Sequence, residues 1–154
     1  MNTKIDKIKN FRLYLLKQIE GLTAQQLNYI PPGYNNNIVW NVGHLISSQQ
    51  NMCYVRAGLP ITVDDRYFSP YISGTKPSAV LNDQQIVNLK DLLITSIDRF
   101  QSDFDKAIFQ NYSPSVMIPK VYGFEVPNID EAIEYLLYHE GFHLGCILSL
   151  KRFV

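Results

Sequence analysis

The three histidines are the residues of this chain whose types and spacing could support chemistry. His139 and His143 lie four positions apart in the segment HEGFH, and residues with this spacing share one face of an α-helix. His44 lies in the segment WNVGHLI, which also has the composition of a helix. Three imidazoles from two facing helices could bind a divalent metal ion and leave a coordination position open for water or a substrate. The spacing of His139 and His143 therefore indicates a metal site, which His44 could complete as the third ligand.

The histidine pair falls on the face of its predicted helix that should be buried. With about 100° between successive residues, His139 and His143 share this face with apolar side chains such as Leu136 and Ile147. Buried imidazoles cost free energy unless they are hydrogen-bonded or bound to a metal. Two interpretations follow. The pair either belongs to a metal site or consists of core histidines that hydrogen-bond to a tyrosine hydroxyl or a backbone carbonyl.

The helix face that carries His44 is more polar. It fits either a solvent-exposed face or a polar pocket, and Trp40 on this face favours the pocket because tryptophan is usually well buried. Cys146 follows His143 by one turn and is interpreted as a small buried hydrophobe, with a reactive thiol or a weak fourth ligand as the alternative. Residues that share faces with the histidines are the predicted lining of a substrate pocket: Trp40, Ser48, Asn51, Tyr135 and Cys146.

The segment HEGFH also matches the HExxH motif of zinc metalloproteases, in which the glutamate is the general base. Only eleven residues follow His143, which leaves no room for a further ligand on another helix. The longer HExxHxxGxxH motif fails because Cys146 and Ser149 occupy its glycine and last histidine positions. A protease is therefore not expected. Glu140 lies about 100° around the helix from His139. It is a candidate catalytic proton acceptor or partner of a ligand, and otherwise a surface carboxylate.

Four segments with helical periodicity must position these residues, and no segment alternates like a strand. Asparagines suit the N-caps of three of them, with Asn35, Asn36 or Asn37 before the second, Asn82 before the third and Asn128 before the fourth. The pattern predicts an all-α, four-helix bundle with long connections. The predicted helices span about 3–20, 35–57, 82–107 and 128–152. A loop over 59–80 is expected to cover the site, and a short extended turn is expected around Gly123 within 115–126.

Composition limits the classes of protein to consider. The 154 residues, 46% of them hydrophobic, fit one domain over 1–154. Fourteen basic residues balance fourteen acidic ones, which argues against a nucleic-acid partner. No apolar run is long enough to span a membrane. Cys53 and Cys146 form no disulfide framework or CxxC pair, and Cys53 lies on the apolar side of its helix. We expect a cytoplasmic protein.

The chain resembles the DinB/YfiT-like superfamily of four-helix metalloproteins. The likeness runs from the end of the first helix at Leu22-Thr23 through LNYIPP at 27–32 and WNVGHL at 40–45 to HEGFHLG at 139–145. Members of this family have one metal-binding histidine on the second helix and an HxxxH pair on the last. The resemblance thus implies His44, His139 and His143 as metal ligands, with zinc or nickel as the expected ion. A glutamine often follows HxxxHxG in the family, and here Cys146 replaces it.

The resemblance also implies a class of activity. Characterised relatives include transferases and isomerases that use low-molecular-weight thiols such as bacillithiol or mycothiol, and many are homodimers. We therefore expect a metal-dependent enzyme that acts on a small molecule. Its metal would activate a small thiol for transfer, or water for hydrolysis. The alternative is a non-catalytic bundle that binds a small molecule or a partner chain and has a structural or vestigial metal site.

Overall fold

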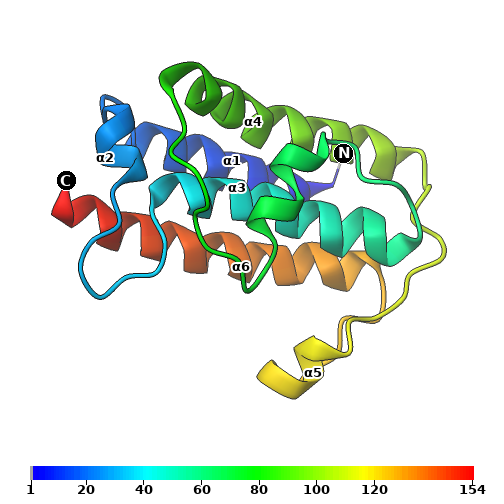
Figure 1. The fold of residues 1–154 in the computed structure, drawn as a ribbon. Helices are drawn as coiled ribbons and strands as arrows, with labels where there is room; N and C mark the ends of the chain where they lie inside the picture. The colour runs from blue at the N-terminus through cyan, green and yellow to red at the C-terminus, as the bar shows by residue number, and fades with distance from the viewer. Residues whose placement is uncertain (1) are drawn as a thin grey trace.

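The computed structural model describes residues 2–154, and within them all regular structure is helical (Figure 1). The four long helices form a bundle, which confirms the predicted fold class. In it α1 and α3 each pack against both α4 and α6. The long helices are α1 (Thr3–Gln18), α3 (Ile38–Gln49), α4 (Asp83–Asp105) and α6 (Ile129–Leu150). None of the described helices has both the length and the apolar character needed to cross a bilayer.

An asparagine N-cap precedes each long helix. The side chain of Asn37 accepts a hydrogen bond from the Trp40 backbone N–H at 2.7 Å, and Asn2, Asn82 and Asn128 do the same at the other three helices. Each such cap contributes about 1 kcal/mol because it satisfies a backbone N–H that has no partner within the helix. The N-caps predicted for the second, third and fourth helices are confirmed, and they fix where the histidine-bearing helices begin.

The second predicted helix has its expected extent but not one uniform hydrogen-bond pattern. After α3 the chain continues as a π-helical turn, Gln50–Tyr54, and a 3-10 turn, Val55–Ala57. The helical run ends at Gly58, whose φ of 70° is in the left-handed region that favours glycine. His44 lies in the regular α-helical part of this run, before the pattern changes.

Two short helices lie outside the predicted elements. The helix α2 (Ala24–Asn28) has a capping box between Thr23 and Gln26, and it is too short to show a periodic apolar pattern. The helix α5 (Met117–Tyr122) ends at Gly123 and lies where an extended turn was predicted, so that prediction was wrong. The connection from α4 to α6 contains α5, and Figure 1 shows α5 projecting away from the bundle, below α6 in this view. Its mostly exposed residues gave no apolar stripe from which a helix could be predicted.

A polar layer divides the hydrophobic core into two clusters along the bundle. One cluster includes Ile5, Ile8 and Phe100, and the other includes Leu15 and Leu93. Between them lies a layer of four buried polar side chains, one from each long helix: Arg12, Gln49, Ser96 and Glu140. This layer lies next to the candidate site, because Glu140 is flanked in α6 by two of the histidines.

The connection between α3 and α4 folds over the bundle rather than extending into solvent. It contains two 3-10 turns, Asp65–Tyr67 and Ser69–Tyr71, both of which contact α3. Figure 1 shows this connection crossing the face of the bundle on which α3 and α6 lie. The expectation that the loop covers the site is supported at Tyr71, which is 8% exposed and contacts His44.

Candidate metal centre

The three histidines predicted as metal ligands lie together where α3 packs against α6. One ring nitrogen from each of His44, His139 and His143 lies within 4.8 Å of the others. The ring centroids are 4.5–5.1 Å apart. His44 and His143 are buried, and His139 is half-buried. Histidine, cysteine, aspartate and glutamate are the residue types that commonly bind metal ions. Among the described residues, these three histidines are the group of such side chains close enough to hold one ion together.

The tautomer of His44 is set by the loop that covers it. Nδ1 of His44 lies 2.6 Å from the backbone carbonyl oxygen of Tyr71. A carbonyl oxygen only accepts hydrogen bonds, so Nδ1 must carry the proton and donate. The lone pair is then on Nε2, which lies 3.3 Å from the Ser48 hydroxyl. His44 can therefore present Nε2 to a cation.

A buried amide sets the tautomer of His143 in the same way. The Nδ2 group of Asn41 donates to the backbone oxygen of Asn37 at 2.7 Å, which fixes the orientation of the amide. Its Oδ1 then faces Nδ1 of His143 at 2.8 Å and accepts the proton of that nitrogen. The lone pair of His143 therefore also lies on Nε2. Hydrogen bonds of this kind to the second ring nitrogen are characteristic of metal-binding histidines.

His139 is the histidine that lacks such a partner. Its Nδ1 is buried and has no hydrogen-bond partner among the described residues. Tyr135 stacks on its ring with centroids 5.9 Å apart, and this contact satisfies no polar atom. A buried nitrogen without a partner costs free energy. A metal ion held by the three imidazoles would compensate part of the cost of burying them, so the residues present fit a divalent cation.

Burial keeps the three imidazoles neutral. It is the main reason why the pKa of His139 falls to about 2 and that of His143 to about 3, and the neighbouring histidines lower both further. Burial also lowers the pKa of His44, although its hydrogen bond to Tyr71 opposes the shift. A metal ligand must have a free lone pair, and neutral imidazoles supply it at neutral pH. The core-histidine interpretation accounts for both ring nitrogens of His44 and for Nδ1 of His143, but it leaves the buried Nδ1 of His139 unexplained.

The predicted pocket residues lie at different distances from this centre. Trp40 stacks on His44 with ring centroids 4.7 Å apart and an interplanar angle of 10°. Ser48 contacts His44, and Tyr135 stacks on His139. Asn51 is half-buried and makes no hydrogen bond to the histidines among the described residues. Cys146 is half-buried, lies outside the group of potential ligands and has a raised thiol pKa because of burial.

Glu140 lies in the interior of the bundle rather than on its surface. Its carboxylate is buried and accepts two hydrogen bonds from Arg12, from Nε at 2.9 Å and Nη2 at 2.7 Å. Burial raises the pKa of Glu140, and the Arg12 guanidinium counteracts this rise. Glu140 is thus not a surface carboxylate. Its Oε1 accepts both hydrogen bonds from Arg12 and belongs to a buried ion pair.

The family model for the DinB superfamily matches residues 9–147 of the chain. The chain belongs to the DinB superfamily. No curated protein and no solved structure matches it. The family match and the clustered histidines agree on a helical fold with a site compatible with a metal ion.

Sequence reasoning about this DinB chain missed three residues that support the site. Arg12 follows Ile5 and Ile8 and precedes Leu15 at helical spacing, so an arginine occupies a core position of the apolar stripe, and that was a readable signal. Asn41 belongs to the segment quoted for the family and precedes His44 by three positions. Tyr71 acts through its backbone carbonyl, which has no signature in the sequence.

Proposed function

We propose that this DinB-superfamily chain is a metal-dependent enzyme with one divalent ion, zinc or nickel, held by His44, His139 and His143. The observation that carries the proposal is the convergence of three neutral imidazoles, one of which has a buried nitrogen without a partner. Imidazole ligands suit both metals. When bound, such an ion lowers the pKa of a coordinated thiol or water and so makes a nucleophile at neutral pH.

The residues around the ion have separate roles in this proposal. Asn41 and the Tyr71 carbonyl orient two of the imidazoles, and Trp40 limits the access of water to His44. We propose transfer of a small thiol to an electrophile as the leading activity. Hydrolysis with Glu140 as the proton acceptor has less support, because Arg12 already binds the Glu140 carboxylate.

The first test of this proposal is metal content, measured by elemental mass spectrometry on untagged protein. We expect about one zinc or nickel ion per chain in the parent and less than a tenth of that in His44→Ala and His143→Ala. Tyr138→Ala is the matched control, because Tyr138 lies beside His139 on α6 but is 70% exposed. A parent that remains metal-free after reconstitution with zinc and nickel would contradict the proposal, as would full metal content in the histidine variants.

Turnover then separates an enzyme from a binding protein. The loaded parent is assayed with low-molecular-weight thiols and chromogenic electrophiles, and in parallel with chromogenic esters. A metal-dependent enzyme loses activity with a chelator and in His143→Ala. Loss of ester hydrolysis in a metal-loaded Glu140→Gln variant would support the hydrolase form. A lower melting temperature in His143→Ala with no turnover by the parent would favour the non-catalytic bundle.

A further inference from the structure

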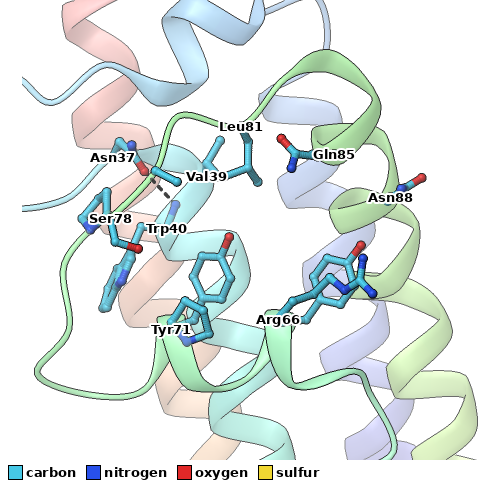
Figure 2. A pocket seen from close by; sticks show the side chains of 13 residues that line it. Asn37, Val39, Trp40, Arg66, Tyr71, Ser78, Leu81, Gln85 and Asn88 are labelled. Atoms are coloured by element: carbon cyan, nitrogen blue, oxygen red, sulfur yellow. Dashed lines mark hydrogen bonds between the residues drawn. The ribbon is translucent and has the colours of Figure 1, made fainter.

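A cavity lies on the other side of Trp40 and Tyr71 from His44. It has a volume of about 240 Å³ and is enclosed by the first turns of α3, the connection between α3 and α4, and the first turns of α4. None of the three histidines lines it. Figure 2 shows Trp40, Tyr71 and Arg66 around this space, with Gln85 and Asn88 on α4. We call it the loop cavity.

Specific packing builds the wall between the loop cavity and His44. A Cβ atom on Gly43 would lie 2.3 Å from the Tyr71 ring, so only a glycine lets this ring lie against α3. The indole Nε1 of Trp40 donates to the Thr75 hydroxyl at 3.2 Å. That hydroxyl lies 2.8 Å from the backbone oxygens of both Pro70 and Ile72, which share its one proton. The two aromatic side chains are therefore held in place by contacts within the protein.

The lining of the loop cavity favours one kind of ligand. Apolar and aromatic groups form most of it, including Trp40, Tyr67 and Tyr71, and such walls suit a planar ring. The amides of Gln85 and Asn88 can offer hydrogen-bond donors, and Arg66 supplies a positive charge. No aspartate or glutamate lines the cavity.

Arg66 remains able to bind an anion although it pairs with Asp64. Its Nη2 donates to Asp64 at 2.9 Å, but both side chains of this pair are more than half exposed. Exposed ion pairs contribute little free energy, so the pair is easily rearranged. A guanidinium has five N–H donors and can bind a carboxylate with two of them.

We propose that the loop cavity is a binding site for a small planar aromatic carboxylate. The ring would pack against Trp40 and Tyr71, and the carboxylate would interact with Arg66. The cavity lies below the range of about 300–1,000 Å³ that is typical of drug-sized ligands, which limits the ligand to a single ring or a small fused system. This site is separate from the metal centre, and its occupant would touch the two residues that contact His44 from this side.

The test uses benzoate as the probe and chelator-treated, metal-free protein, so that the carboxylate has no metal to coordinate. Binding is measured by calorimetry and by the fluorescence of Trp40, which is the single tryptophan of the chain. We expect saturable binding at one site per chain, a Kd of about 1 mM or tighter, and a change in Trp40 fluorescence. An absence of saturable binding would overturn the proposal.

Three variants locate the probe. Ala79→Phe places a ring in the lining from an exposed loop position and should weaken benzoate binding at least tenfold. Arg66→Gln should weaken benzoate several-fold and leave the uncharged benzamide unchanged. His143→Ala, checked for a folded state by circular dichroism, should bind benzoate like the parent. Loss of binding in His143→Ala with retention in Ala79→Phe would place the probe at the histidines and overturn the proposal.

Discussion

The hydrogen bond from His143 to Asn41 links a buried amide to metal affinity. Asn41 is fully buried, and its amide orientation is fixed by the backbone oxygen of Asn37. Asn41→Ala removes the acceptor for Nδ1 of His143, so the ring loses the restraint on its tautomer and orientation. We expect the affinity for zinc to fall about 10–100-fold, the usual effect of removing such a partner. Competition with a chromogenic zinc chelator measures this change.

Asn51→Ala is the control for this prediction. Asn51 lies in the same helical run, is half-buried and makes no hydrogen bond to the histidines among the described residues, so zinc affinity should stay within about twofold of the parent. Asn41→Asp keeps an acceptor for His143 and should recover part of the affinity. If folded Asn41→Ala protein binds zinc as tightly as the parent, Asn41 does not orient a ligand.

At the scale of residues, the sequence could predict the histidines but not what holds them. The four-residue spacing of His139 and His143 follows from helix geometry, and His44 could be added because its segment is also helical. The Tyr71 carbonyl could not be predicted, because every residue has a carbonyl and only the path of the loop places this one against His44. The burial of Glu140 could not be predicted, because its partner, Arg12, is 128 positions away in the chain.

At the scale of helices, one guanidinium connects the four long elements of the bundle. Arg12 on α1 donates to Leu45 and Gln49 on α3, to Leu93 and Ser96 on α4, and to Glu140 on α6. Arg12 is 0% exposed and Glu140 is 2% exposed. The pair therefore restrains α6, and with it the two histidines that α6 contributes to the site.

Removing one member of this pair should destabilise the bundle strongly. Arg12→Met leaves the Glu140 charge buried without a partner, and Glu140→Met leaves Arg12 in the same state. Each change should lower the free energy of unfolding by about 3–5 kcal/mol. The double variant should lose less than the sum of the two single losses, because it leaves no unpaired charge. Urea unfolding of the metal-free proteins measures these values.

Lys9→Met provides the matched comparison on the same helix. Lys9 pairs with Asp98 on α4 in the same α1–α4 interface, but the side chains of this pair are 37% and 51% exposed. Loss of this ion pair should lower the free energy of unfolding by about 0–1 kcal/mol. Equal effects of Lys9→Met and Arg12→Met would show that the buried layer does not stabilise the bundle in the way proposed.

The helices themselves were largely predictable, because their signals are local. Asparagine N-caps and apolar stripes depend on residues within a few turns of one another, and Asn82 with Gln85 forms the capping box that the sequence indicated. The failures occur where local signals are weak. The six residues of α5 show too little periodicity to be recognised, and the π-helical turn after Gln49 has no sequence signal.

At the scale of the whole molecule, the candidate centre joins parts that are far apart in the chain. His44 comes from α3, His139 and His143 come from α6, and Tyr71 attaches the long connection to the same place. A bound ion would therefore restrain two helices and a loop that the metal-free protein holds by packing and hydrogen bonds. Unfolding would separate the three ligands, so binding and folding must be linked.

This linkage predicts that zinc or nickel stabilises the folded protein in proportion to its affinity. With free metal at about 100 times the Kd, the free energy of unfolding should rise by about 2.7 kcal/mol. For a chain of this size the melting temperature should then rise by about 5–11 °C. Thermal unfolding with and without metal measures the shift.

His44→Ala decides what such a shift means. This variant keeps the His139 and His143 pair on one helix but removes the ligand on α3. If the metal stabilises the protein by joining the two helices, the rise in melting temperature on adding metal should fall below about 1 °C in this variant. If His44→Ala is stabilised as much as the parent, the metal acts within α6 alone, because the i,i+4 pair needs only that helix. The comparison therefore separates a site that belongs to the folded bundle from a property of one helical segment.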